Sequence, residues 1–392
     1  MEGPNKSGEV RRGRMTPLAP TSDRSSTTRW MTRVGFVCLS SLAVNAVLIQ
    51  TVLAENSSAK NGVRIFVVAL VAIAIVFGRP RLPMWIVLLS LCSAVLLLAR
   101  DNPDQLSYLF VLVLVPVLRC VRERDLSRIF VGASLTSLLL IFFLLAAGMT
   151  QNEILMPRFR NTFGTASVPF FFNVVYGCTT LLVLHAFNYR LRSRWVLTAI
   201  ATALATYFFQ ATDIRGGYFA YLGFLLLMIA VPHLKTARAA QLFLALLPAF
   251  FLAAAFYLAG LGDDPDANVL LSYRPALYQA FLESLSLSDI FFSTSVKQFD
   301  SSATSIVDNS YLHLLVGGGL IMCVTYVTIY AAAVLNLFRA HRFNEIAFLT
   351  ATSVYFNAES ALVRIENIFV IFSWFLVINN CRRPAREESV QP

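Results

Sequence analysis

Long apolar stretches dominate this chain, and short polar stretches separate them. A hydrocarbon core about 30 Å thick needs roughly 17 to 25 apolar residues per crossing helix. On this basis the sequence predicts spans at 34–53, 63–77, 83–99, 106–118, 129–149, 168–187, 195–211, 216–232, 239–261, 311–338, 345–356 and 368–378. We therefore expect an all-α fold, a polytopic membrane helix bundle with about twelve transmembrane helices.

The charges between these segments support this count. When the spans alternate sides, 23 of the 32 Lys and Arg residues fall on one side and 14 of the 22 Asp and Glu residues on the other. The positive-inside rule makes the basic side cytoplasmic and places both termini there. The fourth segment is short and contains Pro116, but removing it alone would invert every later loop and destroy the bias. Removing two neighbouring spans would keep the charge bias, so ten spans is the alternative count.

Composition agrees with a membrane domain over 33–381, since 57% of residues are apolar, only 14% are charged and the mean hydropathy is +0.66. The polar segment 1–32 cannot bury a core, so we expect a disordered basic cytoplasmic tail that touches membrane lipids. A second cytoplasmic tail covers 382–392. The formal charge of +10 follows from topology and gives no support for nucleic-acid binding.

The motifs of metal and nucleotide chemistry do not occur in this sequence. Six cysteines and four histidines are scattered without metal-ligand spacing, and neither a Walker A lysine motif nor a GxGxxG after a strand is present. We therefore predict no metal and no cofactor.

The 262–310 connection is the longest on the outer side and is the predicted large periplasmic loop. Leu277 and Phe281 recur at helical spacing after Pro275, which suits a first helical turn. We expect a short helix lying at the outer interface, with Arg274 at its start. The alternative is a surface helix that only closes the bundle.

Arginines on the outer side are candidate ligands for an anion, because a guanidinium grips phosphate oxygens two at a time and stays charged. Arg215 lies in a turn too short to leave the membrane boundary, where ionisable groups tend to be functional. Alternatively, it pairs with Asp213 to anchor that turn. Arg158 and Arg160 bracket an aromatic residue, which suits an anionic head group and a sugar, although an ordinary solvated loop is the competing interpretation.

Carboxylates and one histidine complete the candidate chemistry. Asp308 and Asn309 enter the tenth span from outside, and His313 follows Asn309 by one helical turn. Asp308 could instead cap the helix, and His313 could be a packed side chain. Glu359 and Arg364 flank the last outer turn and could pair with each other.

Four short motifs give the chain a resemblance to a known family. They are Arg158-Phe-Arg-Asn-Thr-Phe-Gly, Asp213-Ile-Arg-Gly, Ser272-Tyr-Arg-Pro, and Asp308-Asn-Ser-Tyr-Leu followed by Gly-Gly-Leu. From about residue 158 to the end, the chain resembles the Wzy-type O-antigen, capsule and exopolysaccharide polymerases of the O-antigen ligase and polymerase superfamily. It departs from the family at Ile214, where Ser is common, and at 291–296, where a Gly-rich stretch is common.

The resemblance implies a GT-C-like glycosyltransferase in the bacterial inner membrane that joins undecaprenyl-pyrophosphate-linked oligosaccharide repeat units on the periplasmic face without a metal. The same lipid-linked glycan would be donor and acceptor, and a polysaccharide chain-length regulator and a flippase would be partners. Arg215 and Arg274 would hold the pyrophosphate, and Arg158 or Arg160 a second lipid-linked substrate.

Among the remaining site residues, the resemblance implies Asp308, His313 or Glu359 as general base. The residues Asp213, Tyr273, Asn309 and Arg364 would complete the substrate site. Two other activities compete: an O-antigen ligase that transfers glycan to lipid A core, and a transporter or flippase of lipid-linked sugar. The ligase branch usually has His-Asn where this chain has Asp308-Asn309, which favours a polymerase.

Overall fold

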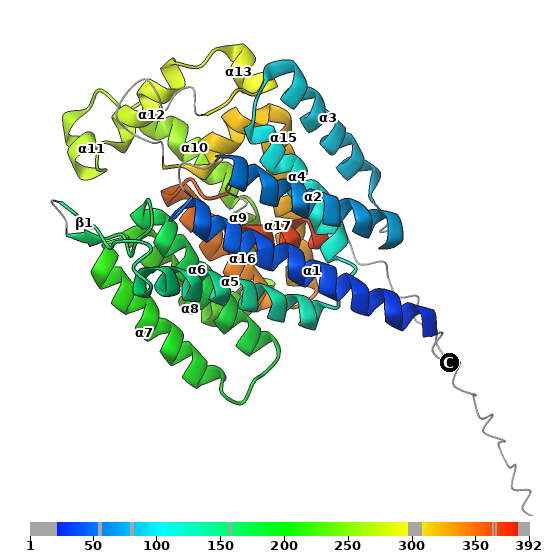
Figure 1. Ribbon diagram of the computed structural model, residues 1–392. Coiled ribbons are helices and arrows are strands. Elements are labelled where there is room, and N and C mark those ends of the chain that lie inside the picture. The colour runs from blue at the N-terminus through cyan, green and yellow to red at the C-terminus, as the bar shows by residue number, and fades with distance from the viewer. Residues whose placement is uncertain are drawn as a thin grey trace, which may run out of the picture.

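The computed structural model describes residues 22–53, 57–78, 82–156, 159–296, 308–362, 364 and 367–382, and these are almost entirely helical (Figure 1). Its first half comprises α1 (Ser22–Ile49), α2 (Ser57–Gly78), α3 (Met84–Arg100), α4 (Asp104–Leu118), α5 (Glu123–Ala146), β1 (Ile154–Leu155), β2 (Arg160–Asn161), α6 (Val168–Asn188) and α7 (Arg194–Thr212). Its second half comprises α8 (Arg215–Ala230), η1 (Val231–Thr236), α9 (Arg238–Ala245), α10 (Leu247–Ala259), α11 (Pro265–Leu270), α12 (Arg274–Glu283), α13 (Leu287–Phe292), α15 (Ser310–Arg339), α16 (Phe343–Ala358) and α17 (Ile368–Asn380).

Each of the twelve predicted segments overlaps a helix, and the all-α prediction is confirmed. Within the described residues, six helices are long and apolar enough to cross a membrane: Arg29–Ile49, Glu123–Ala146, Val168–Asn188, Arg194–Thr212, Arg215–Thr236 and Ser310–Arg339. Several other apolar helices are shorter than a span requires. The chain is therefore a helical membrane protein, and the number of crossings stays a prediction.

The ninth predicted segment differs from expectation because it is not one straight helix. It divides into α9 and α10, which meet at an angle of 63°. Pro248 lies in the first turn of α10, where its missing N–H and its ring prevent a continuous helix through this point. The sequence contained this signal, but apolar composition alone does not register it.

The N-terminal boundary also differs, since α1 begins at Ser22, within the predicted tail. The rest of that tail, residues 1–21, and the C-terminal residues 383–392 lie outside the described residues.

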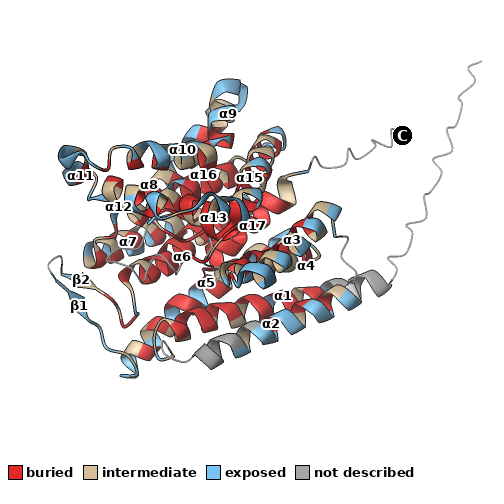
Figure 2. Cartoon of the chain, turned by 90° about the horizontal axis from the view of Figure 1, so that it is seen from above, coloured by how far each residue is buried: buried red, intermediate tan, exposed pale blue. Residues whose placement is uncertain are grey.

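Helix α6 forms the centre of the bundle. In the most apolar 18-residue stretch of α6, 89% of the residues are buried, compared with 22% in the corresponding stretch of α7. Helix α7 packs along the outer side of α6 (Figure 2). Buried tyrosines around α6 satisfy their hydroxyl groups across helices, as a lipid environment requires. The Tyr355 hydroxyl donates to Asn173 Oδ1 at 2.7 Å, and the Tyr176 hydroxyl lies 3.1 Å from Thr352 Oγ1. These contacts tie α6 to α16.

A break in α15 anchors the long outer connection. Gly319 has φ 74° and ψ 170°, a conformation essentially restricted to glycine. The carbonyl of Gly317 accepts hydrogen bonds from Asn102 Nδ2 at 3.0 Å and Gln105 Nε2 at 2.9 Å. Both amides also donate to Ser293 Oγ, at 3.2 and 3.0 Å. The end of α13 is thus held against the α3–α4 turn and the middle of α15.

The predicted helix in the 262–310 loop is present as α12, with Arg274 as its first residue. Pro275 lies in its first turn, and Tyr278 and Phe281 are buried against α10 and α15. Helix α12 therefore packs on the bundle through its apolar face.

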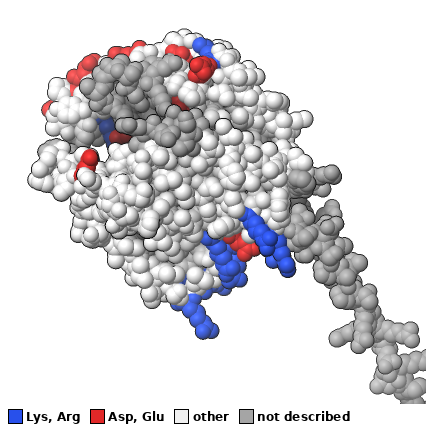
Figure 3. Space-filling model, in the orientation of Figure 1, with Lys and Arg blue, Asp and Glu red and all other residues white. Residues whose placement is uncertain are grey.

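Basic and acidic residues are distributed unevenly between the two ends of the bundle (Figure 3). In the view of Figure 3, lysines and arginines gather along the lower edge, and acidic residues occupy the upper left. The lower cations follow the helix ends of α4, α6 and α15, whereas acidic side chains accompany α11, α13 and the start of α15. We call these the basic end and the acidic end.

Candidate functional site

Charged side chains from four separate segments converge at the acidic end. We call Arg160, Arg274, Asp308, Glu359 and Arg364 the outer polar site. The charges of the other four members all act on the carboxyl group of Glu359. Figure 3 shows basic and acidic atoms together in a hollow on the upper left of this face. Residues far apart in sequence therefore share one electrostatic environment.

Arg160 is positioned by β2, which pairs antiparallel with β1 through Leu155 opposite Arg160. Its Nη2 lies 3.7 Å from Asp213 Oδ2 and donates to the Asp213 carbonyl at 3.4 Å. Arg215 approaches the same carboxylate, with Nε 3.3 Å from Oδ1. The expected alternative for Arg215, a pair with Asp213, is therefore present. The Arg215 side chain remains 69% exposed, so it lies at the margin of the site.

Helix α12 holds Arg274 against the end of α16. Its Nη2 donates to the Ala358 carbonyl at 3.3 Å, the last residue of α16. One turn later on the same face, the buried side chain of Tyr278 hydrogen-bonds Asn309. The packing of the apolar face of α12 against the bundle therefore places Arg274 near the start of α15.

The first turn of α15 is capped by Asn309, and the competing prediction that Asp308 is the cap is wrong. Asn309 Oδ1 accepts hydrogen bonds from the backbone N–H groups of Tyr311 at 2.9 Å and Leu312 at 3.1 Å. Its Nδ2 donates to Asn357 Oδ1 at 3.1 Å. Because Asn309 satisfies the helix start, the Asp308 carboxylate is not used as the cap.

The connection after α16 folds around Ser310. The Ser310 hydroxyl donates to the Glu359 carbonyl at 2.5 Å and accepts from the amides of Ala361 at 2.8 Å and Leu362 at 3.0 Å. Arg364 Nη2 donates to Ser360 Oγ at 3.2 Å. Glu359 and Arg364 therefore meet in one turn, with Arg364 hydrogen-bonded to serine.

Burial and mutual repulsion shift the two carboxyl groups. Burial and the neighbouring Asp308 raise the pKa of Glu359 to about 8, against the opposing charges of Arg364, Arg274 and Arg160. Burial also raises the pKa of Asp308, again opposed by Arg274 and Arg364. Near pH 7 Glu359 is thus mainly neutral and can donate a hydrogen bond, whereas Asp308 is the better candidate for a proton acceptor.

The resulting charge balance favours an anion. Arg160, Arg215, Arg274 and Arg364 carry four positive charges. In the described part of the site, the carboxyl groups of Asp213 and Asp308 oppose these charges, while Glu359 keeps its proton near pH 7. The described side chains of the site therefore carry more positive than negative charge near pH 7. Guanidinium groups fixed by hydrogen bonds suit a diphosphate, because they need little reorganisation when negative charge develops.

Three other predicted site residues have different positions. Tyr273 lies just before α12 with φ 61° and is 63% exposed. His313 is partly buried in the first turns of α15, where its backbone amide donates to the Asn309 carbonyl at 3.2 Å. Arg158 lies outside the described residues.

Sequence reasoning missed Tyr278, Ser310 and Asn357, which position the site. Tyr278 follows Arg274 by four residues, so helical spacing could have shown that both share a face. Ser310 and Asn357 carry no such signal, since their partners lie 49 and 48 residues away.

Fold and site together define a helical membrane protein with an arginine-rich polar site at one end. Among the described residues, no group of three or more His, Cys, Asp and Glu side chains could hold a metal ion. Comparison with protein-family models, curated proteins and solved structures found no match.

Proposed function

We propose that this protein is a polysaccharide polymerase that joins undecaprenyl-pyrophosphate-linked oligosaccharide units at the acidic end, facing the periplasm. The observation that carries the proposal is the convergence of Arg160, Arg274 and Arg364 around Asp308 and Glu359. Most of the Lys and Arg side chains visible in Figure 3 lie along the opposite end, which supports the orientation. The motif resemblance supplies the substrate class.

The reaction is transfer of a glycan to a sugar hydroxyl. The bond between the anomeric carbon and the phosphate oxygen breaks, and a bond from the acceptor oxygen to that carbon forms. The pyrophosphate leaves with the bonding electron pair. Arg274 and Arg364 stabilise the charge that develops on it, while Arg160 and the more exposed Arg215 hold the remainder of the lipid-linked substrates.

Asp308 takes the proton of the acceptor hydroxyl in this proposal, because its charge lies among those of Arg274 and Arg364 and its carboxylate is not used in helix capping, which Asn309 performs. Glu359 remains protonated near pH 7 and so does not repel the diphosphate. The pair therefore divides the roles of base and neutral hydrogen-bond donor.

The decisive experiment incubates purified protein with lipid-linked repeat units and separates the products by size. A ladder of glycan lengths that Arg364→Ala abolishes supports the proposal. Transfer of finished glycan to lipid A core without a ladder would identify a ligase. Movement of the lipid-linked unit across a vesicle membrane without any new glycosidic bond would identify a transporter.

A further inference from the structure

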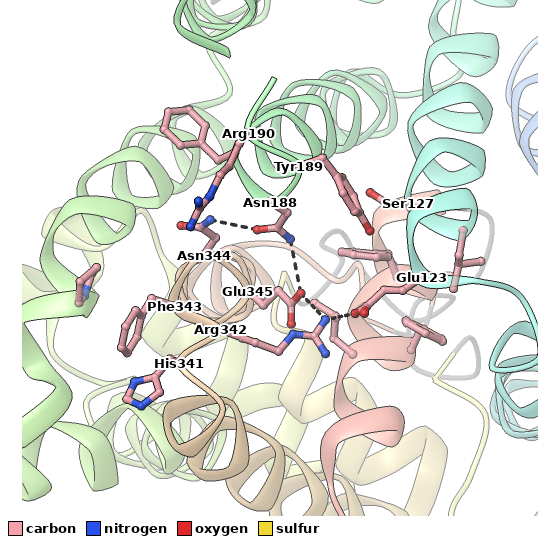
Figure 4. A pocket seen from close by; sticks show the side chains of 16 residues that line it. Glu123, Ser127, Asn188, Tyr189, Arg190, His341, Arg342, Phe343, Asn344 and Glu345 are labelled. Atoms are coloured by element: carbon pink, nitrogen blue, oxygen red, sulfur yellow. Dashed lines mark hydrogen bonds and ion pairs between the residues drawn. The ribbon is translucent and has the colours of Figure 1, made fainter. Parts of the chain in front are cut away.

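A second polar cavity lies at the basic end, remote from the outer polar site. It has a volume of about 390 Å³ and lies between the α4–α5, α6–α7 and α15–α16 connections (Figure 4). Its polar lining includes Glu123, Asn188, Arg190, Arg342 and Glu345. The proposed polymerisation uses none of these residues, so the cavity needs its own explanation.

Glu345 is the deepest charged group in this lining, and its residue exposure is only 5%. Arg342 bridges Glu345 and Glu123, and Asn188 Nδ2 donates to Glu345 Oε1 at 3.4 Å. Among the described residues, Glu345 Oε2 has no hydrogen-bond partner. Figure 4 shows this second oxygen apart from the dashed contacts of the first. A buried carboxyl oxygen without a hydrogen-bond partner is unfavourable. Once Glu345 is ionised this oxygen can only accept, so the cavity suits a cationic ligand that donates to it and whose positive charge favours the carboxylate over the neutral acid.

Arg190 supplies the opposite charge at the rim. It follows α6 with φ 48°, and no acidic side chain lies within ion-pair distance of it in the described parts of the chain. Figure 4 shows its side chain directed toward Asn344, which itself donates to Asn188 Oδ1 at 3.0 Å. The charge of Arg342, by contrast, is balanced by its two glutamates. A bound group therefore meets a free acceptor inside and a free cation at the entrance.

The remaining wall is apolar and includes Phe187, Phe372 and Phe375. We propose that the cavity binds the headgroup of phosphatidylethanolamine, with the ammonium donating to Glu345 Oε2 and the phosphate held by Arg190. The ammonium provides N–H donors that a quaternary choline lacks, and the aromatic wall accommodates the glycerol end of the lipid. This proposal is independent of the reaction at the acidic end.

The test measures how short-chain phosphatidylethanolamine raises the thermal midpoint of the purified full chain, since a ligand that binds the folded state stabilises it. Phosphatidylcholine and phosphatidylglycerol with the same acyl chains are the comparisons. Water-soluble glycerophosphoethanolamine tests whether the headgroup alone suffices. We expect phosphatidylethanolamine to bind about tenfold more tightly than phosphatidylcholine, the margin expected for loss of a charge-assisted hydrogen bond.

Two variants and one matched control locate the site. Arg190→Ala and Glu345→Gln should each weaken phosphatidylethanolamine binding about tenfold. Arg192→Ala, an exposed arginine of the same connection outside the cavity, should leave it unchanged. If Glu345→Gln does not fold, Arg190→Ala decides alone. Equal binding of all three lipids, as for a cavity that holds only water, would overturn the proposal. So would wild-type affinity in Arg190→Ala, or a preference for phosphatidylglycerol.

Discussion

Arg274 Nη2 donates to the carbonyl of Ala358 at 3.3 Å and joins the start of α12 to the end of α16 across 84 positions of sequence. This bond helps to hold the guanidinium where its charge acts on Asp308 and Glu359. We predict that Arg274→Ala lowers polymerisation by about 10²-fold, the loss typical when one preorganised charge-stabilising donor is removed. Arg274→Lys should restore little activity, because an ammonium lacks the forked geometry. Initial rates of ladder formation measure both effects.

Arg100 provides the control for Arg274. It is also an arginine at the acidic end, where its guanidinium lies 5.7 Å from the centre of the Phe292 ring, and it is not one of the charges acting on Glu359. Arg100→Ala should retain nearly wild-type rates. A full-length ladder from Arg274→Ala at normal protein levels would contradict the assigned role.

The pH dependence of anion binding should follow the ionisation of the Glu359 carboxyl group. Its pKa is raised to about 8, so it is mainly neutral below this pH and adds a negative charge to the site above it. The affinity for undecaprenyl pyrophosphate should therefore fall several-fold as the pH rises from 7 to 9. Glu359→Gln cannot ionise and should lose this decrease. Ionisation of the ligand affects both proteins equally, so the difference between their binding curves reports Glu359 alone.

The same shift predicts a change in fold stability. A carboxyl group whose folded pKa exceeds its unfolded value of about 4.5 stabilises the fold most at low pH, and this contribution is lost as the pH rises to about 8. Wild-type protein should thus lose stability between these values relative to Glu359→Gln. Thermal midpoints of both proteins across the range measure the difference. Parallel pH profiles would show that Glu359 is not shifted in the folded protein.

The sequence was sufficient to predict the helices, and it pointed to several of the residues that meet in the outer polar site, for reasons specific to each. Apolar length marks each helix without regard to its neighbours, which is why every predicted segment overlaps one. Arg274 was identifiable because Pro275 and the apolar face of α12 signal a helix that begins there. Local signals such as these depend on residues a few positions apart.

Long-range geometry was not available from the sequence. The choice of Asn309 over Asp308 as helix cap depends on backbone geometry and on Asn357 in another helix. The short turn made Arg215 look like the more central arginine, but its side chain is 69% exposed. Arg160, which is held by a β-strand, is the one whose charge acts on Glu359. Which arginine faces the carboxyl pair is decided by packing between segments.

Gly319 is a test of the break in α15. A Cβ there would lie 3.1 Å from the Phe291 carbonyl oxygen and 3.2 Å from the Ser293 nitrogen, both backbone atoms, and its φ of 74° disfavours other residues. We predict that Gly319→Ala destabilises the fold by about 1–3 kcal/mol. Gly223→Ala is the control, because nothing lies within 4 Å of a Cβ at that helical position. It should be neutral or slightly stabilising. Equal thermal midpoints for the two variants would contradict this interpretation.

Asn102 and Gln105 both donate to the Gly317 carbonyl, so their substitutions should not be additive. Either single alanine variant leaves one of the two amide donors on that carbonyl, whereas the double variant removes both from a buried acceptor. We expect each single change to destabilise the fold by about 1 kcal/mol and the double change by more than their sum. Unfolding in denaturing detergent measures all three, with Gln210→Ala on the exposed face of α7 as the control. Strict additivity would show that the two amides act independently, and the anchoring of α13 through a shared carbonyl would then be wrong.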